Sequence, residues 1–288
     1  MPAKKTISCA FCDDTGWRPL DEHGVRRVVR CDCWRDQVTA QALSFAKIPA
    51  RYRRCEFSNF ITYPNERLLN AVKAARRFAD SFPVVDKGLL IIGPPGIGKT
   101  HLAVAALREA IRRTGVQGRY YDTRGLLTQI RSTYNSTTKM AEMDVIRPVM
   151  EAKLLILDDL GAERLTDWVE ETMNVIVNAR YNAKLPTIFT SNYEDVPDKD
   201  EMNSLLVRVG FRLHSRLREM CEFLEYDGPD YRELPPNIDG DDICKLWKSQ
   251  PRRKLPSRAS GSARAQIREP AVRDGRADLK WPGGRAGS

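Results

Sequence analysis

The chain contains no long apolar run. None of its 288 residues lies in a stretch approaching the roughly 18–20 consecutive apolar residues that a membrane-spanning helix needs. The first residues, M-P-A-K-K-T-I-S-C, also lack the apolar segment of a secretory signal. Internal repeats are absent as well. We therefore expect a cytoplasmic protein without a membrane partner, whose cysteines stay reduced.

Charge is distributed unevenly along the chain, whose formal net charge is +9. Residues 1–55 carry 11 basic and 6 acidic side chains, and residues 251–288 carry 10 and 3. The body between them is nearly neutral, with 26 basic and 29 acidic side chains. Basic ends suit a polyanionic partner, most simply nucleic acid. The C-terminal end, rich in Pro, Gly, Ser and Arg, is predicted to be a disordered tail, and an extension that only increases solubility is the alternative to a nucleic-acid contact.

A complete phosphate-binding loop stands at residues 93–100, which read G-P-P-G-I-G-K-T. A short apolar run precedes it at 88–92, and a segment with helical apolar spacing follows at 101–113, the setting in which such a motif is specific. Backbone N–H groups of the loop then point at phosphate oxygens, Lys99 reaches the β- and γ-phosphates, and Thr100 can ligate Mg²⁺. We predict that the chain binds ATP. The residues expected around the nucleotide are Gly93, Pro94, Pro95, Gly96, Ile97, Gly98, Lys99, Thr100 and His101.

A second buried strand ends in two aspartates, in the run K-L-L-I-L-D-D-L-G-A at residues 153–162. Ligands of open α/β sheets lie at the carboxyl ends of the strands, so both carboxylates should face the nucleotide. Asp158 is placed to hold Mg²⁺, directly or through water. Asp159 is suited to polarise the water that attacks the γ-phosphate. Together with the phosphate loop, this pair predicts Mg²⁺-dependent ATP hydrolysis.

Five further polar residues lie in or after later strands and helices. Asn192 ends the strand L-P-T-I-F-T-S-N, where its amide can orient the attacking water; a loop-capping role is the alternative. Arg208, Arg212 and Arg216 are spaced by four and should share one helix face, which is either solvated or reaches the nucleotide of a neighbouring subunit. Arg232 follows the last strand and can approach the phosphates of its own subunit.

Four of the seven cysteines cluster near the N-terminus, in C-A-F-C at 9–12 and C-D-C at 31–33. Two such pairs supply the four thiolates that tetrahedral Zn²⁺ requires. A metal would hold together a ribbon hairpin too small to build its own core. The predicted ligands are Cys9, Cys12, Cys31 and Cys33, with His23 as a substitute; unligated cysteines or a redox pair are the alternatives.

Apolar spacing predicts strands that alternate with helices, and hence an α/β fold with a parallel sheet covered on both faces. The expected strands lie at 88–92, 118–122, 154–157, 185–192 and 221–226, and the expected helices at 34–45, 66–82, 101–113, 123–134, 141–151, 168–183 and 201–219. The predicted parts are a cysteine-rich module at 1–35, a basic and aromatic linker at 36–60, an ATPase domain at 61–249 and the tail at 250–288.

These motifs together resemble the DnaC/DnaI/IstB branch of the AAA+ ATPases. The resemblance covers roughly residues 36–235 and rests on G-P-P-G-I-G-K-T, L-L-I-L-D-D-L-G-A-E, N-A-R-Y, L-P-T-I-F-T-S-N-Y, R-L-H-S-R-L-R-E-M-C, G-P-D-Y-R and the lead-in I-P-A-R-Y-R-R-C-E-F-S-N-F. It implies a five-stranded core of the ASCE type with Walker A at 93–100 and Walker B at 154–159. It also implies that the cysteine-rich module is similar to the helicase-contacting N-terminal domain of one loader subgroup.

The resemblance also implies roles for single residues. Asn192 would be sensor 1, Arg212 the arginine finger with Arg216 beside it, and Arg232 the sensor 2 arginine. An arginine finger acts in trans, so the active form should be an oligomer. Two departures are a short C-terminal lid and Asp159, which stands where AAA+ relatives usually carry Glu and implies slow, switch-like turnover.

Two functions are expected from this branch. The first is a replicative helicase loader that grips single-stranded DNA, with Arg124, Arg131 and Lys139 as phosphate contacts; ordinary surface charge is the alternative for each. The second is an IstB-like transposition helper that binds duplex DNA and a transposase. The cysteine-rich module favours the loader. A small-molecule kinase is disfavoured by the D-D and T-S-N runs and the arginines that follow them, and no acceptor pocket is apparent. A nucleic-acid-binding module with a vestigial ATP site is disfavoured because every catalytic position is filled.

Overall fold

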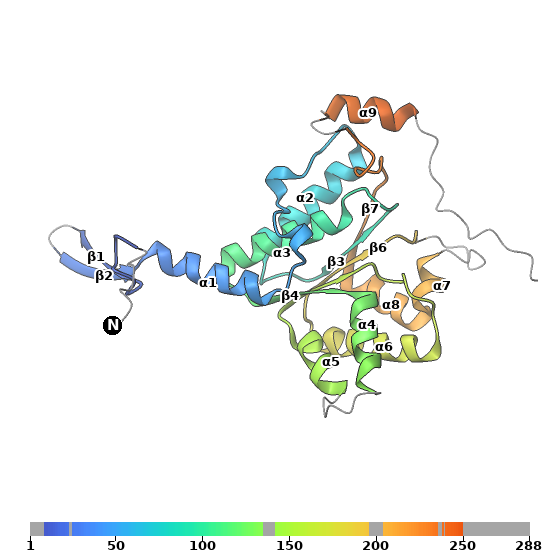
Figure 1. The fold of residues 1–288 in the computed structure, drawn as a ribbon, viewed down its shortest axis with the longest axis horizontal. Helices are drawn as coiled ribbons and strands as arrows, with labels where there is room; N and C mark the ends of the chain where they lie inside the picture. The colour runs from blue at the N-terminus through green and yellow to red at the C-terminus, as the bar shows by residue number, and fades with distance from the viewer. Residues whose placement is uncertain are drawn as a thin grey trace, which may run out of the picture. The chain divides into compact units, whose positions relative to one another are not determined.

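The computed structural model describes residues 9–22, 25–134, 142–195, 204–235, 238 and 240–249. In this part of the chain, the strands form an antiparallel ribbon and a five-stranded parallel sheet (Figure 1). The strands are β1 (Trp17–Glu22), β2 (Val25–Arg30), β3 (Gly88–Ile92), β4 (Gly118–Asp122), β5 (Leu154–Asp158), β6 (Thr187–Ser191) and β7 (Cys221–Glu225). The helices are α1 (Asp32–Phe45), α2 (Glu66–Ser81), α3 (Lys99–Thr114), α4 (Thr123–Thr133), α5 (Glu142–Glu151), α6 (Asp167–Asn182), α7 (Leu205–Val209), α8 (Phe211–Met220) and α9 (Gly240–Ser249), with short 3-10 turns η1 (Ala50–Tyr52) and η2 (Phe57–Asn59).

The order of strands in the large sheet is β4-β5-β6-β3-β7. β6 therefore lies between β3, which leads into the phosphate loop, and β5, which ends in the acidic pair. This confirms the predicted α/β class and the five-stranded parallel sheet. It also decides which loops meet, because the carboxyl ends of parallel strands lie at one edge of the sheet.

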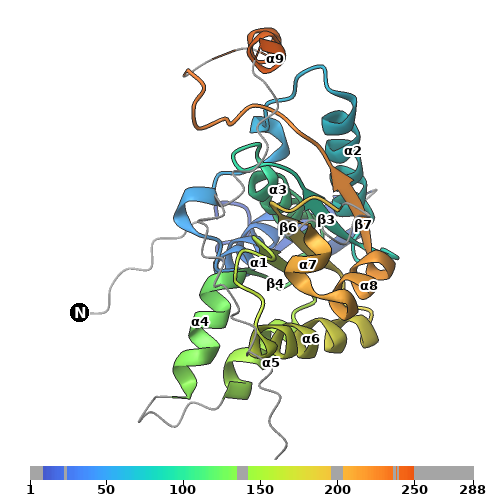
Figure 2. The ribbon, with the colours of Figure 1, turned by 90° about the vertical axis from the view of Figure 1, so that its right-hand side faces the viewer.

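Every residue of β3, β5 and β6 is buried, as expected of parallel strands covered on both faces. Alternate residues enter two different cores because side chains alternate along a strand. Leu89 and Ile91 pack in the core built by α2 and α3, whereas Leu90 and Ile92 pack in the core built by helices α4 to α8. Figure 2 shows these two groups of helices on opposite sides of the sheet.

Side-chain caps fix where several helices begin. Asn65 accepts a hydrogen bond from the N–H of Leu68 at the start of α2, and Thr166 accepts one from the N–H of Val169 at the start of α6. Such caps satisfy N–H groups that have no partner within the helix. The expected strands at 88–92 and 118–122 are confirmed to the residue by β3 and β4.

The single helix expected at 201–219 is wrong in one respect. Gly210, with φ 83° and ψ 155°, separates α7 from α8, a backbone conformation that favours glycine. Arg208 therefore lies on α7 and does not share a helix face with Arg212 and Arg216, which lie on α8. The first residues of the expected helix, and the predicted tail at 250–288, fall outside the described residues.

Across the described ranges, none of the helices combines the length and the apolar composition needed to cross a membrane. The predicted boundaries between the cysteine-rich module, the linker and the ATPase domain stay predictions.

Arg180, on α6, is the largest side chain that is completely buried. Its guanidinium donates hydrogen bonds to the carbonyl oxygens of Val149, Ala152 and Pro186 at 3.0, 2.8 and 2.8 Å. It also donates to the hydroxyl of Thr187 at 2.8 Å. One side chain thereby joins α6 to the end of α5 and to the start of β6.

We expect Arg180→Met to lower the free energy of unfolding by about 3 kcal/mol, since it leaves several buried carbonyl groups without donors. Urea denaturation followed by circular dichroism measures the loss. Arg180→Lys, which keeps some donors, should lose less, and the exposed Arg164→Met should change stability by no more than about 0.5 kcal/mol. A loss for Arg180→Met as small as that of Arg164→Met would contradict the anchoring role.

Candidate nucleotide-binding site

The phosphate loop connects β3 to α3 through backbone conformations that favour glycine. Gly98 has φ 92° and occupies the cap position of α3, so the N–H groups of the first helical turn are directed into the loop. Gly93 is required for a second reason, because a Cβ atom there would lie 2.1 Å from the carbonyl oxygen of Tyr226. The residues predicted to surround the nucleotide phosphates thus form one turn at the carboxyl end of the sheet.

The ammonium of Lys99 lies inside this turn and is almost completely buried. It donates hydrogen bonds to the carbonyl oxygens of Gly93 at 2.8 Å and Pro94 at 2.7 Å, and to Asn192 Oδ1 at 2.7 Å. Burial lowers the pKa of Lys99 to about 8, although the carboxylates of Asp159 and Asp158 act in the opposite direction. The protonation of Lys99 at the centre of the site therefore depends on the nearby carboxylates of Asp158 and Asp159.

Asp158, at the end of β5, is buried and accepts hydrogen bonds from three hydroxyl groups. Thr100 donates to both carboxylate oxygens at 2.9 and 3.1 Å, Thr190 donates to Oδ1 at 2.6 Å, and Tyr120 donates to Oδ2 at 2.7 Å. The adjacent oxygens of Thr100 and Asp158 are hard donors beside the phosphate loop, the kind of set that fits Mg²⁺. We did not predict Tyr120 or Thr190; their only sequence signal was a polar residue within each expected strand.

Asp159 and Asn192 complete the cluster. Asp159 has φ 60°, and its N–H donates to the hydroxyl of Thr190 at 2.9 Å. Asn192 donates from Nδ2 to Asp159 Oδ1 while its own Oδ1 accepts from Lys99. Burial and the neighbouring Asp158 raise the pKa of Asp159. The structure thus brings together five of the predicted site residues: Lys99, Thr100, Asp158, Asp159 and Asn192.

The predicted arginines occupy two different places. Arg232 is exposed and close enough for its charge to add to the effect of burial on the pKa of Lys99. Its loop is held on the phosphate loop because the N–H of Tyr231 donates to the carbonyl oxygen of Gly96 at 3.0 Å. Arg212 is exposed on α8, and Arg216 donates to Asn174 Oδ1 at 3.4 Å and to the carbonyl oxygen of Arg212 at 3.1 Å. Among the described residues, neither contacts the phosphate loop.

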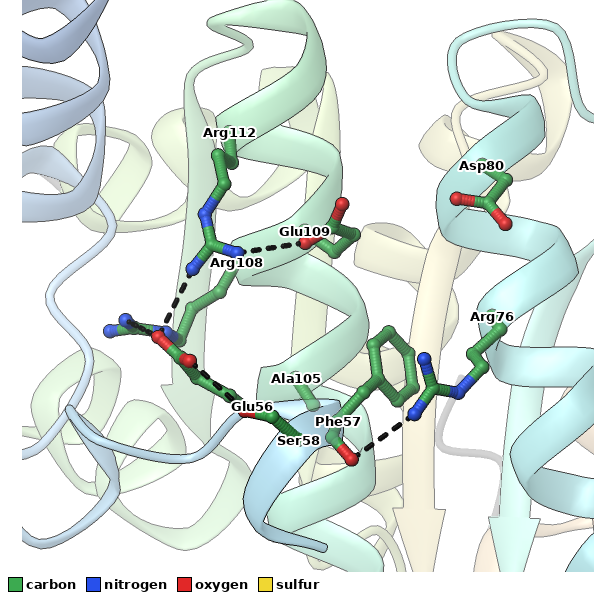
Figure 3. Close-up of a pocket in the computed structure, with 9 residues that line it drawn as sticks. All are labelled: Glu56, Phe57, Ser58, Arg76, Asp80, Ala105, Arg108, Glu109 and Arg112. Atoms are coloured by element: carbon green, nitrogen blue, oxygen red, sulfur yellow. Dashed lines mark hydrogen bonds and ion pairs between the residues drawn. The ribbon is translucent and has the colours of Figure 1, made fainter.

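The lead-in segment at 48–60 packs against the phosphate loop and the first turn of α3. His101 Nε2 lies 3.0 Å from the carbonyl oxygen of Glu56 and 2.9 Å from Asn59 Oδ1, so this side chain faces the lead-in. The carboxylate of Glu56 pairs with Arg108 at 2.7 Å and Arg112 at 3.0 Å, and these hydrogen-bonded arginines lower its pKa. Glu56, Arg108 and Arg112 help to line a hollow of about 200 Å³ between the lead-in and helices α2 and α3. Figure 3 shows the residues around it.

The four N-terminal cysteines converge as predicted. Their sulfur atoms all lie within 4.8 Å of one another, with Cys9 and Cys31 Sγ 3.7 Å apart and Cys12 and Cys33 Sγ 3.2 Å apart. Tetrahedral Zn²⁺ with Zn–S bonds of about 2.3 Å places its sulfur ligands roughly 3.8 Å apart. The sulfur positions therefore fit a zinc ion, and the alternative ligand His23 lies outside the described residues.

Comparison with known proteins identifies the family. The model of the family described as "IstB-like ATP binding protein" matches residues 12–232, which is more than half of the chain. The chain belongs to the IstB-like ATP-binding protein family.

Two curated proteins have sequences similar to that of this chain. The uncharacterized protein YqaM of Bacillus subtilis (strain 168) is 25% identical over 210 residues, which are 69% of this chain and 64% of YqaM. The chain thus spans less than two thirds of that relative. The replicative helicase loader DnaC of Buchnera aphidicola subsp. Acyrthosiphon pisum (strain APS) is 27% identical over 184 residues, which are 63% of this chain and 71% of the loader.

A solved structure of a related protein agrees with this family assignment. The crystal structure of the DnaC helicase loader superposes with a TM-score of 0.54 and 32% identity, covering 62% of this chain and 99% of the loader. The predicted AAA+ fold of the IstB-like chain is thereby confirmed.

The arginines predicted to contact single-stranded DNA have partners within the IstB-like chain itself. Arg124 pairs with Glu163 at 2.9 Å, and the guanidinium of Arg131 lies 4.6 Å from the ring centroid of Trp168. Lys139 lies outside the described residues. Their contact with DNA stays a prediction.

We expect ATP to bind about tenfold more weakly at pH 9 than at pH 7. With a pKa of about 8, Lys99 is mostly uncharged at pH 9, whereas bound phosphates favour the ammonium, so binding above pH 8 requires proton uptake. Titration with a fluorescent ATP analogue measures the affinity, and calorimetry in two buffers measures the proton uptake. The exposed Lys153→Ala should keep this pH dependence and Lys99→Ala should lose it. A wild-type affinity that is flat from pH 7 to 9 would contradict the assignment.

We expect the purified protein to contain one zinc ion per chain, because four thiolates converge at the N-terminus. Plasma mass spectrometry measures the metal content. Cys12→Ser should lose the zinc, whereas Cys55→Ser, which removes a buried cysteine outside the cluster, should retain it. Equal zinc content in both variants, or none in the wild type, would rule out the site.

Proposed function

We propose that this protein is a Mg²⁺-dependent ATPase that loads a replicative helicase onto single-stranded DNA in the cytoplasm. The observation that carries the ATPase part is the hydrogen-bonded cluster of the buried Lys99 with the half-buried Asp159 and Asn192 beside the phosphate loop. In this proposal Lys99 would neutralise charge on the β- and γ-phosphates. Thr100 and Asp158 would hold Mg²⁺, which would lower the charge of the reacting phosphate.

Asp159 and Asn192 act on the attacking water. Burial raises the pKa of Asp159, which makes its carboxylate a better proton acceptor while Lys99 limits the shift. The direct hydrogen bond from Asn192 to Asp159 holds both groups at the same end of the sheet. Turnover is slow and switch-like in this proposal, because an aspartate reaches less far than the usual glutamate.

Two sets of arginines complete the site. Arg232 acts within its own subunit, since its charge already influences Lys99. Arg212, with Arg216 beside it, acts on the nucleotide of a neighbouring subunit, so that ATP favours self-association. The exposure of Arg212 and the place of both residues away from their own phosphate loop support this division.

The helicase-loading part of the proposal rests on similarity to a DnaC helicase loader whose structure this chain covers by 99%. The converging cysteines support it, with Zn²⁺ as a structural ion and a helicase as the partner of the N-terminal module. The IstB-like family match supports a second candidate, a transposition helper that binds duplex DNA and a transposase.

We expect single-stranded DNA to stimulate steady-state ATP hydrolysis by the wild type, and both Lys99→Ala and Arg212→Ala to abolish most of the activity. Loss of one oxyanion- or phosphate-stabilising charge typically costs about 10²–10³ in rate. Mixing the two variants should restore part of the activity, because Arg212 of the first can then complete the nucleotide site of the second. Arg67→Ala, an exposed arginine on α2, is the control.

The alternatives give different results in the same assay. Stimulation by duplex DNA alone would favour the transposition helper. Hydrolysis that is unaffected by Arg212→Ala and by any DNA would exclude both oligomeric functions.

A further inference from the structure

Asp158 is held by hydroxyl groups from three neighbouring elements of the core. Thr100 comes from α3, Thr190 from β6 and Tyr120 from β4, and the carboxylate that they surround is only 7% exposed. Thr100 reaches both oxygens, and Thr190 donates to Oδ1. Among the described residues, Tyr120 is the one donor that contacts Oδ2, at 2.7 Å, without also contacting Oδ1.

Tyr120 is itself held in place by residues that precede the sheet. Tyr120 is 6% exposed, and its ring lies against that of Tyr52 with centroids 6.4 Å apart. Its backbone N–H donates to the carbonyl oxygen of Ala46 at 2.9 Å. A rigid donor of this kind restricts the rotation of the carboxylate that accepts from it.

Of the adjacent residues Tyr120 and Tyr121, only Tyr120 is placed to donate to Asp158. Tyr120 and Tyr121 follow one another on β4, so their side chains lie on opposite faces of the sheet. Tyr120 packs in the core built by α2 and α3, and Tyr121 packs against the core built by α4 to α8. The chain therefore contains a matched control for removal of the Tyr120 hydroxyl.

We propose that Tyr120 is a positioning residue for magnesium: its hydroxyl holds the Asp158 carboxylate in one orientation and thereby sets the affinity of the nucleotide complex for Mg²⁺. This inference rests on the proposed role of Asp158 at the ATP site. Groups that orient a metal-binding carboxylate typically change metal affinity by about 10- to 100-fold when removed. Tyr120 acts only through Asp158, so nucleotide contacts that need no metal are independent of it.

The test is a Mg²⁺ titration of the binding of a fluorescent ATP analogue to the full chain. Tyr120→Phe keeps the ring against Tyr52 and should raise the half-saturating Mg²⁺ concentration about tenfold. Excess Mg²⁺ should restore wild-type nucleotide affinity, and affinity in EDTA should match the wild type, neither of which a damaged fold would show. Tyr121→Phe should titrate like the wild type, and urea denaturation checks that both variants are folded.

Thr190→Val removes one of the two donors to Oδ1 and provides a second variant, which should shift the Mg²⁺ titration in the same direction. A half-saturating Mg²⁺ concentration for Tyr120→Phe equal to that of Tyr121→Phe, or lower, would overturn the inference while Mg²⁺-dependent binding by the wild type upholds the proposed site. Nucleotide binding by the wild type that does not respond to Mg²⁺ would instead contradict the proposed role of Asp158.

Discussion

The structure depends on a buried cluster of charge at the carboxyl end of the central sheet. An ammonium and a carboxylate, Lys99 and Asp158, are each only 7% exposed, and Asp159 lies beside them. Burying such groups is costly unless each is paired and hydrogen-bonded. Lys99 is held by two backbone carbonyl groups and an amide, and Asp158 by three hydroxyl groups. The neighbouring strands and helices supply these partners, which explains why polar residues occur inside otherwise apolar strands.

Side chains from segments distant in sequence pack around the phosphate loop. Phe60, before the core, lies so close to Gly98 that a Cβ atom there would be 3.0 Å from its ring. The loop after β7 is held to the segment that follows the lead-in, because Tyr63 donates to the carbonyl oxygen of Asp227 at 3.0 Å. Segments from before β3 and after β7 therefore meet beside the phosphate loop.

The spacing of glycines and apolar residues predicted the strands and helices well, because each of these elements depends mainly on residues close together in the sequence. The glycines of the phosphate loop and the apolar run before it predicted the bounds of β3 correctly. Five predicted site residues meet because each lies at or just after the carboxyl end of a parallel strand. Gly210 was missed because a single glycine does not by itself break a helix of amphipathic residues. The hydrogen bond of Tyr120 was missed because it depends on which strands are neighbours in the sheet, a property of the whole chain. The role proposed for Arg212 requires a second subunit, so it does not follow from the pattern of a single chain.

β4 is an edge strand, since it stands at one end of the sheet order. Outer edges of sheets expose unpaired N–H and C=O groups that can pair with a strand of another molecule. Here the carbonyl group of Ala46, just after α1, takes the N–H of Tyr120, and Arg119 lies with its guanidinium 3.5 Å from the ring centroid of Phe45. The residues that precede the ATPase core therefore shield its open edge. A fragment that begins at residue 61 would uncover this edge strand for pairing with another copy, so the solubility of such a fragment would depend on the segment that precedes it.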